Sequence, residues 1–227
     1  MKKLTIIGII GFGLFATQIT EAQGTLTYLS NLGQTSTGNN PVGSNSWLAA
    51  GFFTGTNVNG YILNSVQLGM ADASGSPSGF TVMLYSAISG LGTNPGNNLD
   101  TLNGSLSPVS GGIFTYTSTD NLTLSPNTEY FIVLTAGTAV ANGAYEWNFM
   151  NTSSYNPVDN WLATVTLSSN NGSSSWTRLG TNPNFDYSGF ALNAIPAPEP
   201  SPSWLLLLGS GIFIYVRRTF QRHNKTS

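Results

Sequence analysis

The chain has 227 residues, of which 40% are hydrophobic, with no cysteine, one histidine and a formal net charge of −2. The lack of cysteine excludes a disulfide framework and a thiolate metal site. Six of the seven lysines and arginines lie near the two ends, so the middle of the chain lacks the basic patch that nucleic acid requires. We therefore expect no nucleic-acid partner.

The first 22 residues have the pattern of a secretory signal peptide. Lys2 and Lys3 precede an apolar run over residues 4–16, and small residues end at Ala22, just before Gln23. The run is shorter than the about 20 residues of a membrane-spanning helix, which favours a cleaved signal over a permanent anchor. We expect signal peptidase to cut between Ala22 and Gln23 and the protein to be exported.

Residues 23–195 are expected to form one exported domain, because their number suits a single compact core. Seven acidic side chains against one arginine give this segment a net charge of −6. Its polar residues are mainly serine, threonine, asparagine and glycine. Aromatic and branched side chains recur regularly between the polar stretches, which favours a folded domain over a disordered one.

Short strand patterns follow one another through this domain. Residues 66, 68 and 70 are apolar and would share one face of a strand. Residues 80–85 are rich in β-branched and aromatic side chains. Residues 130–135 are apolar on both faces, as in a strand that is covered on both sides. The expected strands cover 25–29, 47–54, 60–70, 80–85, 113–117, 130–135, 144–150, 161–167, 176–179 and 187–193. They predict an all-β domain, an antiparallel β-sandwich of jelly-roll type.

Residues 196–227 contain three consecutive parts of a sorting signal. The motif residues and the basic residues are Pro198, Glu199 and Pro200, then Arg217, Arg218, Arg222 and Lys225 in the tail over 217–227. Between them, the apolar run over residues 203–216 predicts a transmembrane helix of marginal length. The basic tail predicts a cytoplasmic C-terminus by the positive-inside rule, which leaves the domain outside the cytoplasmic membrane.

These three parts together resemble the PEP-CTERM sorting signal of exported bacterial proteins. The resemblance implies that an exosortase recognises and cleaves this end of the chain. The protein would first be held in the cytoplasmic membrane by the C-terminal helix and then reach the cell surface or the extracellular matrix.

A second resemblance covers about residues 29–192. The blocks 46–49, 61–68, 76–85 and 124–134 are similar to the choice-of-anchor R domain. That family is an exported module joined to interchangeable surface anchors, so the resemblance implies a surface or matrix protein and no known reaction. We expect a protein that is not an enzyme.

A distant alternative is a glycosidase that uses two carboxylates, Glu129 and Glu146. The only histidine, His223, lies in the basic tail, so the exported domain has no histidine for a nucleophile or a metal site. A calcium site is a weak possibility in the segments that contain Asp100 and Asp186, whose oxygen atoms suit Ca²⁺. Ordinary turns explain the same residues, and we expect no cofactor.

The main alternative is a carbohydrate-binding module for matrix polysaccharide. It rests on four tryptophans, Trp47, Trp147, Trp161 and Trp176, in a domain with few charges. Tryptophan in a sandwich more often belongs to the core. Trp147 and Trp161 are the predicted sugar-stacking residues, because both lie near loop junctions.

Overall fold

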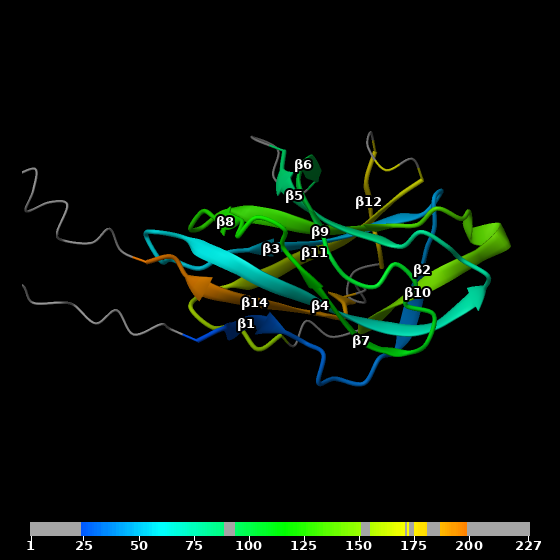
Figure 1. Ribbon diagram of the computed structural model, residues 1–227, viewed down its shortest axis with the longest axis horizontal. Helices are drawn as coiled ribbons and strands as arrows, with labels where there is room; N and C mark the ends of the chain where they lie inside the picture. Colours follow the sequence, from blue (N-terminus) through cyan, green and yellow to red (C-terminus); the bar gives the residue numbers. More distant parts are fainter. Residues whose placement is uncertain are drawn as a thin grey trace, which may run out of the picture.

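The computed structural model describes residues 24–88, 94–150, 155–170, 172, 175–180 and 187–198. These residues form antiparallel strands and one short 3-10 helix, η1 (Val140–Asn142), and they include no α-helix (Figure 1). The prediction of an all-β, antiparallel domain is confirmed. The expected signal peptide and transmembrane helix lie outside the described residues. None of the helices in the described part has the length and hydropathy that a bilayer crossing needs.

Two sheets make up the structure. The eight-stranded sheet contains β1 (Leu26–Ser30), β2 (Gly38–Val42), β4 (Tyr61–Gly75), β7 (Gly112–Thr117), β8 (Thr123–Leu124), β10 (Gly143–Met150), β13 (Tyr187–Ser188) and β14 (Phe190–Pro196). The six-stranded sheet contains β3 (Trp47–Phe53), β5 (Thr81–Ala87), β6 (Pro95–Leu102), β9 (Glu129–Thr135), β11 (Leu162–Ser169) and β12 (Thr177–Arg178). In the six-stranded sheet the spatial order is β12-β11-β3-β9-β5-β6.

The first and last strands of the domain are neighbours. Leu26 in β1 pairs with Ala194 in β14, and β14 pairs on its other side with β4. The chain therefore enters and leaves the domain at the same end, which we call the proximal end and which lies at the left of Figure 1. The opposite, distal end contains the turn after Gly75 and the 3-10 helix η1, where Ser78 and Thr138 are hydrogen-bonded.

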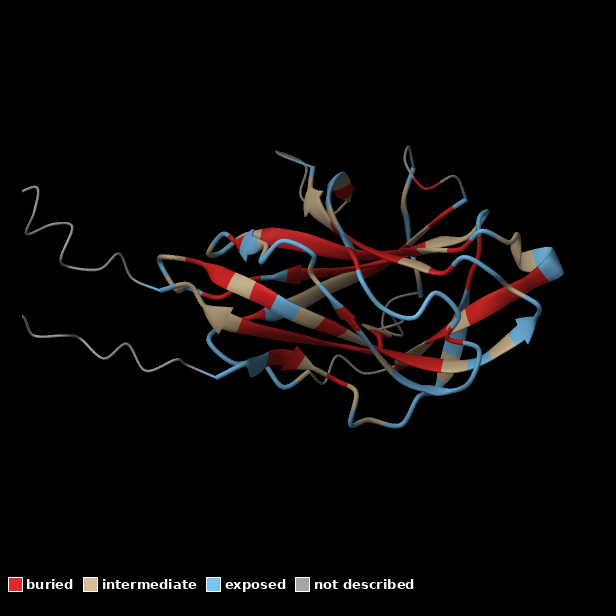
Figure 2. Cartoon of the chain, in the orientation of Figure 1, coloured by how far each residue is buried: buried red, intermediate tan, exposed pale blue. Residues whose placement is uncertain are grey.

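The main core lies between the two sheets. Trp147 and Tyr61 enter it from the eight-stranded sheet, and Phe52 and Ile132 enter it from the six-stranded sheet; all four are buried. Burial runs along the middle of the long strands, while the turns are exposed (Figure 2). Because one apolar cluster joins the inner faces of both sheets, the two sheets form a sandwich.

A second apolar cluster covers the outer face of the six-stranded sheet. Phe131 and Val133 of β9 point to this face and are fully buried, beside Ala49, Met83 and Leu167. Their neighbours Tyr130, Ile132 and Leu134 belong to the main core. The prediction that residues 130–135 form a strand covered on both sides is confirmed, since alternate side chains of β9 are buried on opposite faces.

Two strands form where the sequence suggests loops. β2 has the sequence GNNPV, and β6 has the sequence PGNNLDTL, so both are rich in residues that are depleted in strands. Each pairs with one neighbouring strand: β2 with β10, and β6 with β5. Pairing with a neighbouring strand therefore decides their conformation, and local propensity does not.

Candidate functional site

The two tryptophans predicted to stack on sugar rings are buried in the core, and that prediction is wrong. The side chains of Trp147 and Trp161 are each 1% exposed. Trp147 lies in β10, and its Nε1 donates a hydrogen bond of 2.9 Å to the carbonyl oxygen of Gly189. A ring with no exposed face cannot bind a sugar, so both residues have a structural role.

Trp161 is the centre of an aromatic cluster at the proximal end. Its ring stacks on Tyr28 and Phe52, with ring centroids 5.1 and 5.7 Å away, and meets the edge of Tyr61 at 5.0 Å. Its Nε1 has no hydrogen-bond partner among the described residues. Contacts between aromatic rings therefore hold this side chain in place.

A carboxylate contacts this cluster through Tyr61. The Tyr61 hydroxyl donates a hydrogen bond to Oδ2 of Asp159, and the Thr56 hydroxyl donates one of 3.2 Å to Oδ1. Burial and the hydrogen bond to Asp159 raise the pKa of Tyr61 to about 12. The hydroxyl is therefore neutral at physiological pH, and it acts as a hydrogen-bond donor that fixes the loop before β11.

The carboxylates of the alternative glycosidase site do not share a cleft. Glu129 begins β9 and alternates with the core residue Tyr130, so its side chain points to the outer face of the six-stranded sheet. Glu146 lies between the core residues Tyr145 and Trp147, so it points to the outer face of the other sheet. The two carboxyl groups lie on opposite sides of the sandwich, which argues against a catalytic pair.

Each of these glutamates has a local partner. Thr164 donates a hydrogen bond of 3.0 Å to Glu129, and Ser74 donates one of 3.1 Å to Glu146. Partial burial raises the pKa of Glu146 despite the hydrogen bond from Ser74. Both residues are therefore accounted for by contacts within their own sheets.

Asp100, a weak calcium candidate, is bound by hydrogen-bond donors instead. Its Oδ2 accepts hydrogen bonds from the Ser118 hydroxyl at 2.6 Å and the Thr119 amide at 3.1 Å, and its Oδ1 accepts one from the Thr119 hydroxyl at 2.6 Å. Partial burial acts to raise the pKa of Asp100, but these hydrogen bonds together lower it. The carboxylate thus joins β6 to the residues after β7.

Asp186 lies outside the described residues, and the described part holds no group of three acidic, histidine or cysteine side chains that could bind a metal.

Exposed aromatic area is found instead on the outer face of the six-stranded sheet. Trp47, Tyr85 and Trp176 are half-buried there and pack against the second apolar cluster. Trp47 donates a hydrogen bond of 3.2 Å from Nε1 to the carbonyl oxygen of Ser44, and its ring lies against Gly172. Alternation could not single out Trp47 in advance, because residues 47–53 are almost entirely apolar.

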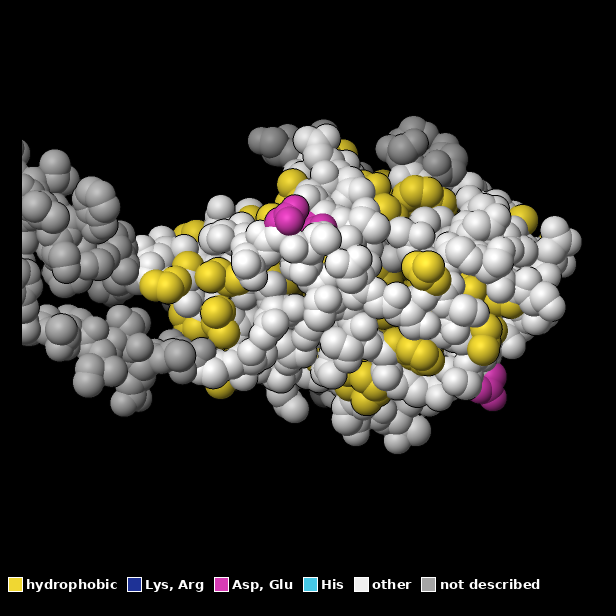
Figure 3. Space-filling view, in the orientation of Figure 1, with side chains coloured by type: hydrophobic (Ala, Val, Ile, Leu, Met, Phe, Trp, Pro, Cys, Tyr) yellow, Lys and Arg dark blue, Asp and Glu magenta, His cyan; other side chains and the backbone are white. Residues whose placement is uncertain are grey.

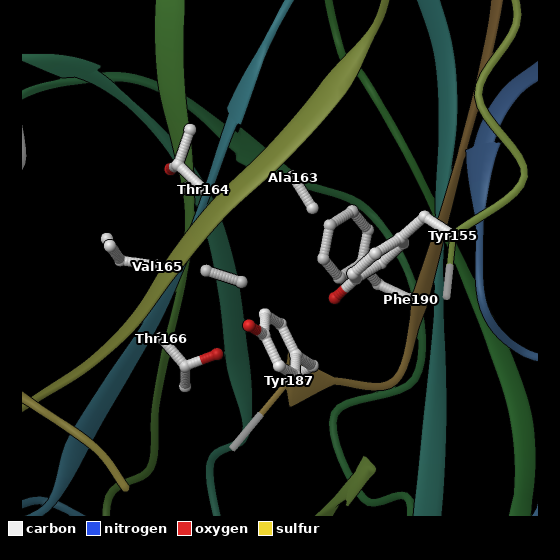
Figure 4. A pocket seen from close by; sticks show the side chains of 9 residues that line it. Tyr155, Ala163, Thr164, Val165, Thr166, Tyr187 and Phe190 are labelled. Carbon is white, nitrogen blue, oxygen red and sulfur yellow. The ribbon is translucent and has the colours of Figure 1, made fainter. Parts of the chain in front are cut away.

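A shallow hollow lies between β11 and the first residues of β13 and β14. Tyr155, Tyr187 and Phe190 line it, with Thr166 on the opposite wall (Figure 4). The Tyr155 hydroxyl donates a hydrogen bond of 3.0 Å to the carbonyl oxygen of Ser188. The hollow is too narrow to hold a water molecule, so it offers no ligand site.

The predicted sorting motif begins where the sandwich ends. The Ala197 amide donates a hydrogen bond of 2.9 Å to the carbonyl oxygen of Gly60, and the next residue, Pro198, is exposed. Glu199, Pro200 and the basic residues that follow lie outside the described residues, as do Ala22 and Gln23.

Comparison with family models, with curated proteins and with solved structures finds no match for this chain.

Proposed function

We propose that this chain is a non-enzymatic bacterial cell-surface or extracellular-matrix protein. Its exported part is a β-sandwich of jelly-roll type. A signal peptide over residues 1–22 directs export, and a C-terminal helix over residues 203–216 first anchors the protein in the cytoplasmic membrane. Signal peptidase and an exosortase are its processing partners. The exosortase recognises the segment that begins with Pro198, Glu199 and Pro200.

One observation carries this proposal. The chain enters the sandwich at Leu26 and leaves it beside Ala194, so both sequence signals are attached to the same end of the domain. A domain tethered there presents its distal end, with η1 and the turn after Gly75, away from the membrane. The exposed Pro198 also makes the start of the motif accessible to an enzyme in the membrane.

The test is the intact mass of the protein recovered from the cell-surface and medium fractions of its own host. We expect loss of residues 1–22 and of the tail beyond about Pro200. A mass that retains residues 204–227 would make the tail a permanent anchor and would remove the exosortase from the proposal.

A pair of variants sharpens this test. Glu199→Ala changes the motif, and Pro202→Ala changes a proline just outside it. We expect the first variant to accumulate with its tail intact and the second to be processed like the parent protein. Equal processing of both variants would contradict recognition of the motif.

A second candidate function is binding of a neutral polysaccharide, and the half-buried Trp47, Tyr85 and Trp176 favour it. These rings lie on an outer face with few charges, which suits uncharged sugar rings. Affinity electrophoresis in gels that contain matrix polysaccharide should retard the protein, and Trp176→Ala should weaken the retardation. Trp147 and Trp161 take no part in this candidate, because both are buried. Equal migration with and without polysaccharide would remove it.

A further inference from the structure

Large apolar side chains are exposed around the proximal end of the sandwich. We call them the proximal rim: Leu26, Phe53, Val58, Val158 and Leu162. Their exposed fractions run from 37% at Phe53 to 81% at Val58. Figure 3 shows hydrophobic side chains at this end, beside the point where the two ends of the chain leave the sandwich, and others elsewhere on the same face.

Backbone contacts place the rim residues around one end. Phe53, the last residue of β3, pairs with Leu162, the first residue of β11. Val58 lies in the turn that ends at Gly60, whose carbonyl oxygen accepts the hydrogen bond from Ala197. Val58 is therefore next to the exit of the chain.

The other two rim residues lie beside β1. The Val158 amide donates a hydrogen bond of 2.8 Å to the carbonyl oxygen of Tyr28, and Leu26 opens the same strand. The aromatic cluster of Tyr28, Tyr61 and Trp161 lies at this end of the core. The rim thus lies beside a closely packed part of the core.

We propose that the proximal rim rests on the outer surface of the cytoplasmic membrane while the protein is still held by its C-terminal helix. This inference rests on the proposed function. From Pro198 to Trp204 the chain advances six residues, which can span no more than about 20 Å. The end that carries the rim is therefore the part of the domain that the tether keeps nearest to the lipid.

The chemistry of the rim suits lipid more than a charged partner. Arg178 is the only basic residue between Gly24 and Pro198, and it pairs with Leu167, which is remote from Leu162 along β11. Asp159, beside the rim, already accepts hydrogen bonds from Tyr61 and Thr56. The contact is therefore apolar, and we expect it to be independent of salt concentration.

The experiment uses full-length protein in nanodiscs, with one protein per disc and lipids that carry a quencher in their acyl chains. Because the chain has no cysteine, single cysteines can be labelled selectively with a fluorophore. The rim positions are Val58→Cys and Val158→Cys. The matched control is Leu106→Cys, since Leu106 is also apolar and exposed but its carbonyl oxygen contacts Phe80 and Tyr145 in the distal half. Leu206→Cys reports on the tail.

We expect lipid quenching at the rim, at the depth of about 5–10 Å typical of interfacial apolar groups, and none at Leu106. Quenching at Val158 should persist in high salt and be lost when Val58→Asp and Leu162→Asp are combined. Near-ultraviolet circular dichroism checks that the double variant keeps its fold.

The outcomes separate the two proposals. Quenching at Leu206 with rim labels that behave like Leu106 would overturn the rim contact and leave the membrane tether intact. No quenching at Leu206 or at the rim would overturn both. Rim labels that respond to a second protein copy, added in excess, but not to lipid would assign the rim to a protein contact and overturn the membrane contact.

Discussion

The hydroxyl of Tyr61, the first residue of β4, donates a hydrogen bond to the carboxylate of Asp159 in the loop that precedes β11. One residue of the eight-stranded sheet thus fixes a loop that leads into the six-stranded sheet. Asp159 and the next residue, Asn160, have positive φ values of 53° and 60°. Because such values are uncommon outside glycine, the hydrogen bond helps to hold an otherwise unfavourable conformation.

This relationship predicts a loss of stability at alkaline pH. Burial and the hydrogen bond to Asp159 raise the pKa of Tyr61 from 10.0 to about 12 in the folded protein. A raised folded-state pKa means that the contribution of Tyr61 is complete below pH 10 and is lost as the pH rises through 12. Urea unfolding at several pH values should show this decline, and Tyr61→Phe should make it smaller. An unchanged decline in Tyr61→Phe would assign it to the other tyrosines whose pKa values are raised by burial, which are Tyr28, Tyr85, Tyr116 and Tyr155.

Removal of the Trp161 ring should destabilise the folded protein. We expect Trp161→Ala to lower the free energy of unfolding by about 3–5 kcal/mol, because the ring is buried and its contacts with Tyr28 and Phe52 would be lost. Trp176→Ala is the control, since Trp176 is half-buried and should cost less. Chemical denaturation measures both values. Equal losses would contradict the central position of Trp161.

The hydrogen bonds of Asp100 predict a structural role without calcium. Asp100→Ala leaves the Ser118 hydroxyl and the Thr119 amide without their acceptor, and we expect a loss of about 0.5–1.5 kcal/mol because water can reach these donors. The exposed Asp120 gives the matched control, Asp120→Ala. The lowered pKa of Asp100 means that its contribution is present above pH 3.8, the ordinary value, and is lost as the pH falls through the folded-state pKa. A melting temperature that rises with Ca²⁺ in the parent and not in Asp100→Ala would restore the calcium site.

Gly172 should tolerate no side chain. Its φ is +72°, and a Cβ atom there would lie 2.3 Å from the ring of Trp47. We expect Gly172→Ala to destabilise the protein by about 1–3 kcal/mol and to change the fluorescence of Trp47, because the ring must move. Gly33→Ala is the control, since a Cβ atom there meets nothing within 4 Å. A neutral Gly172→Ala would mean that Trp47 shifts freely, and its ring would then gain interest as a sugar contact.

The main strands could be predicted from the sequence because apolar alternation is local. Val66, Leu68 and Met70 are all buried on one face of β4, as their spacing predicts. The inward orientation of Trp147 also follows from alternation, since it shares a face with Tyr145 while Glu146 faces outward. The sugar-stacking prediction for Trp147 is wrong because this period decides the orientation of the ring, whereas proximity to a loop does not.

Other features depend on distant pairing and could not be predicted. Trp161 precedes β11, and only the packing of Tyr28 and Phe52 from two different sheets shows that it is buried. The proximal rim is likewise assembled from separate segments, so no local pattern marks it. The opposite orientations of Glu129 and Glu146 required the strand order, which two isolated glutamates in a sequence do not reveal.

The position of β14 also has a mechanical consequence. β14 leads directly to the segment that we propose as the C-terminal tether; it pairs along its length with β4 on one side and over residues 191–194 with β1 on the other. A pull on the tether is directed along the strand, so the hydrogen bonds on both sides are loaded in shear, all at once. A strand at the edge of a sheet, pulled across its ladder, would instead lose them one after another. In the proposed anchoring, the domain would be attached through a strand that resists unravelling by shear flow or by neighbouring cells.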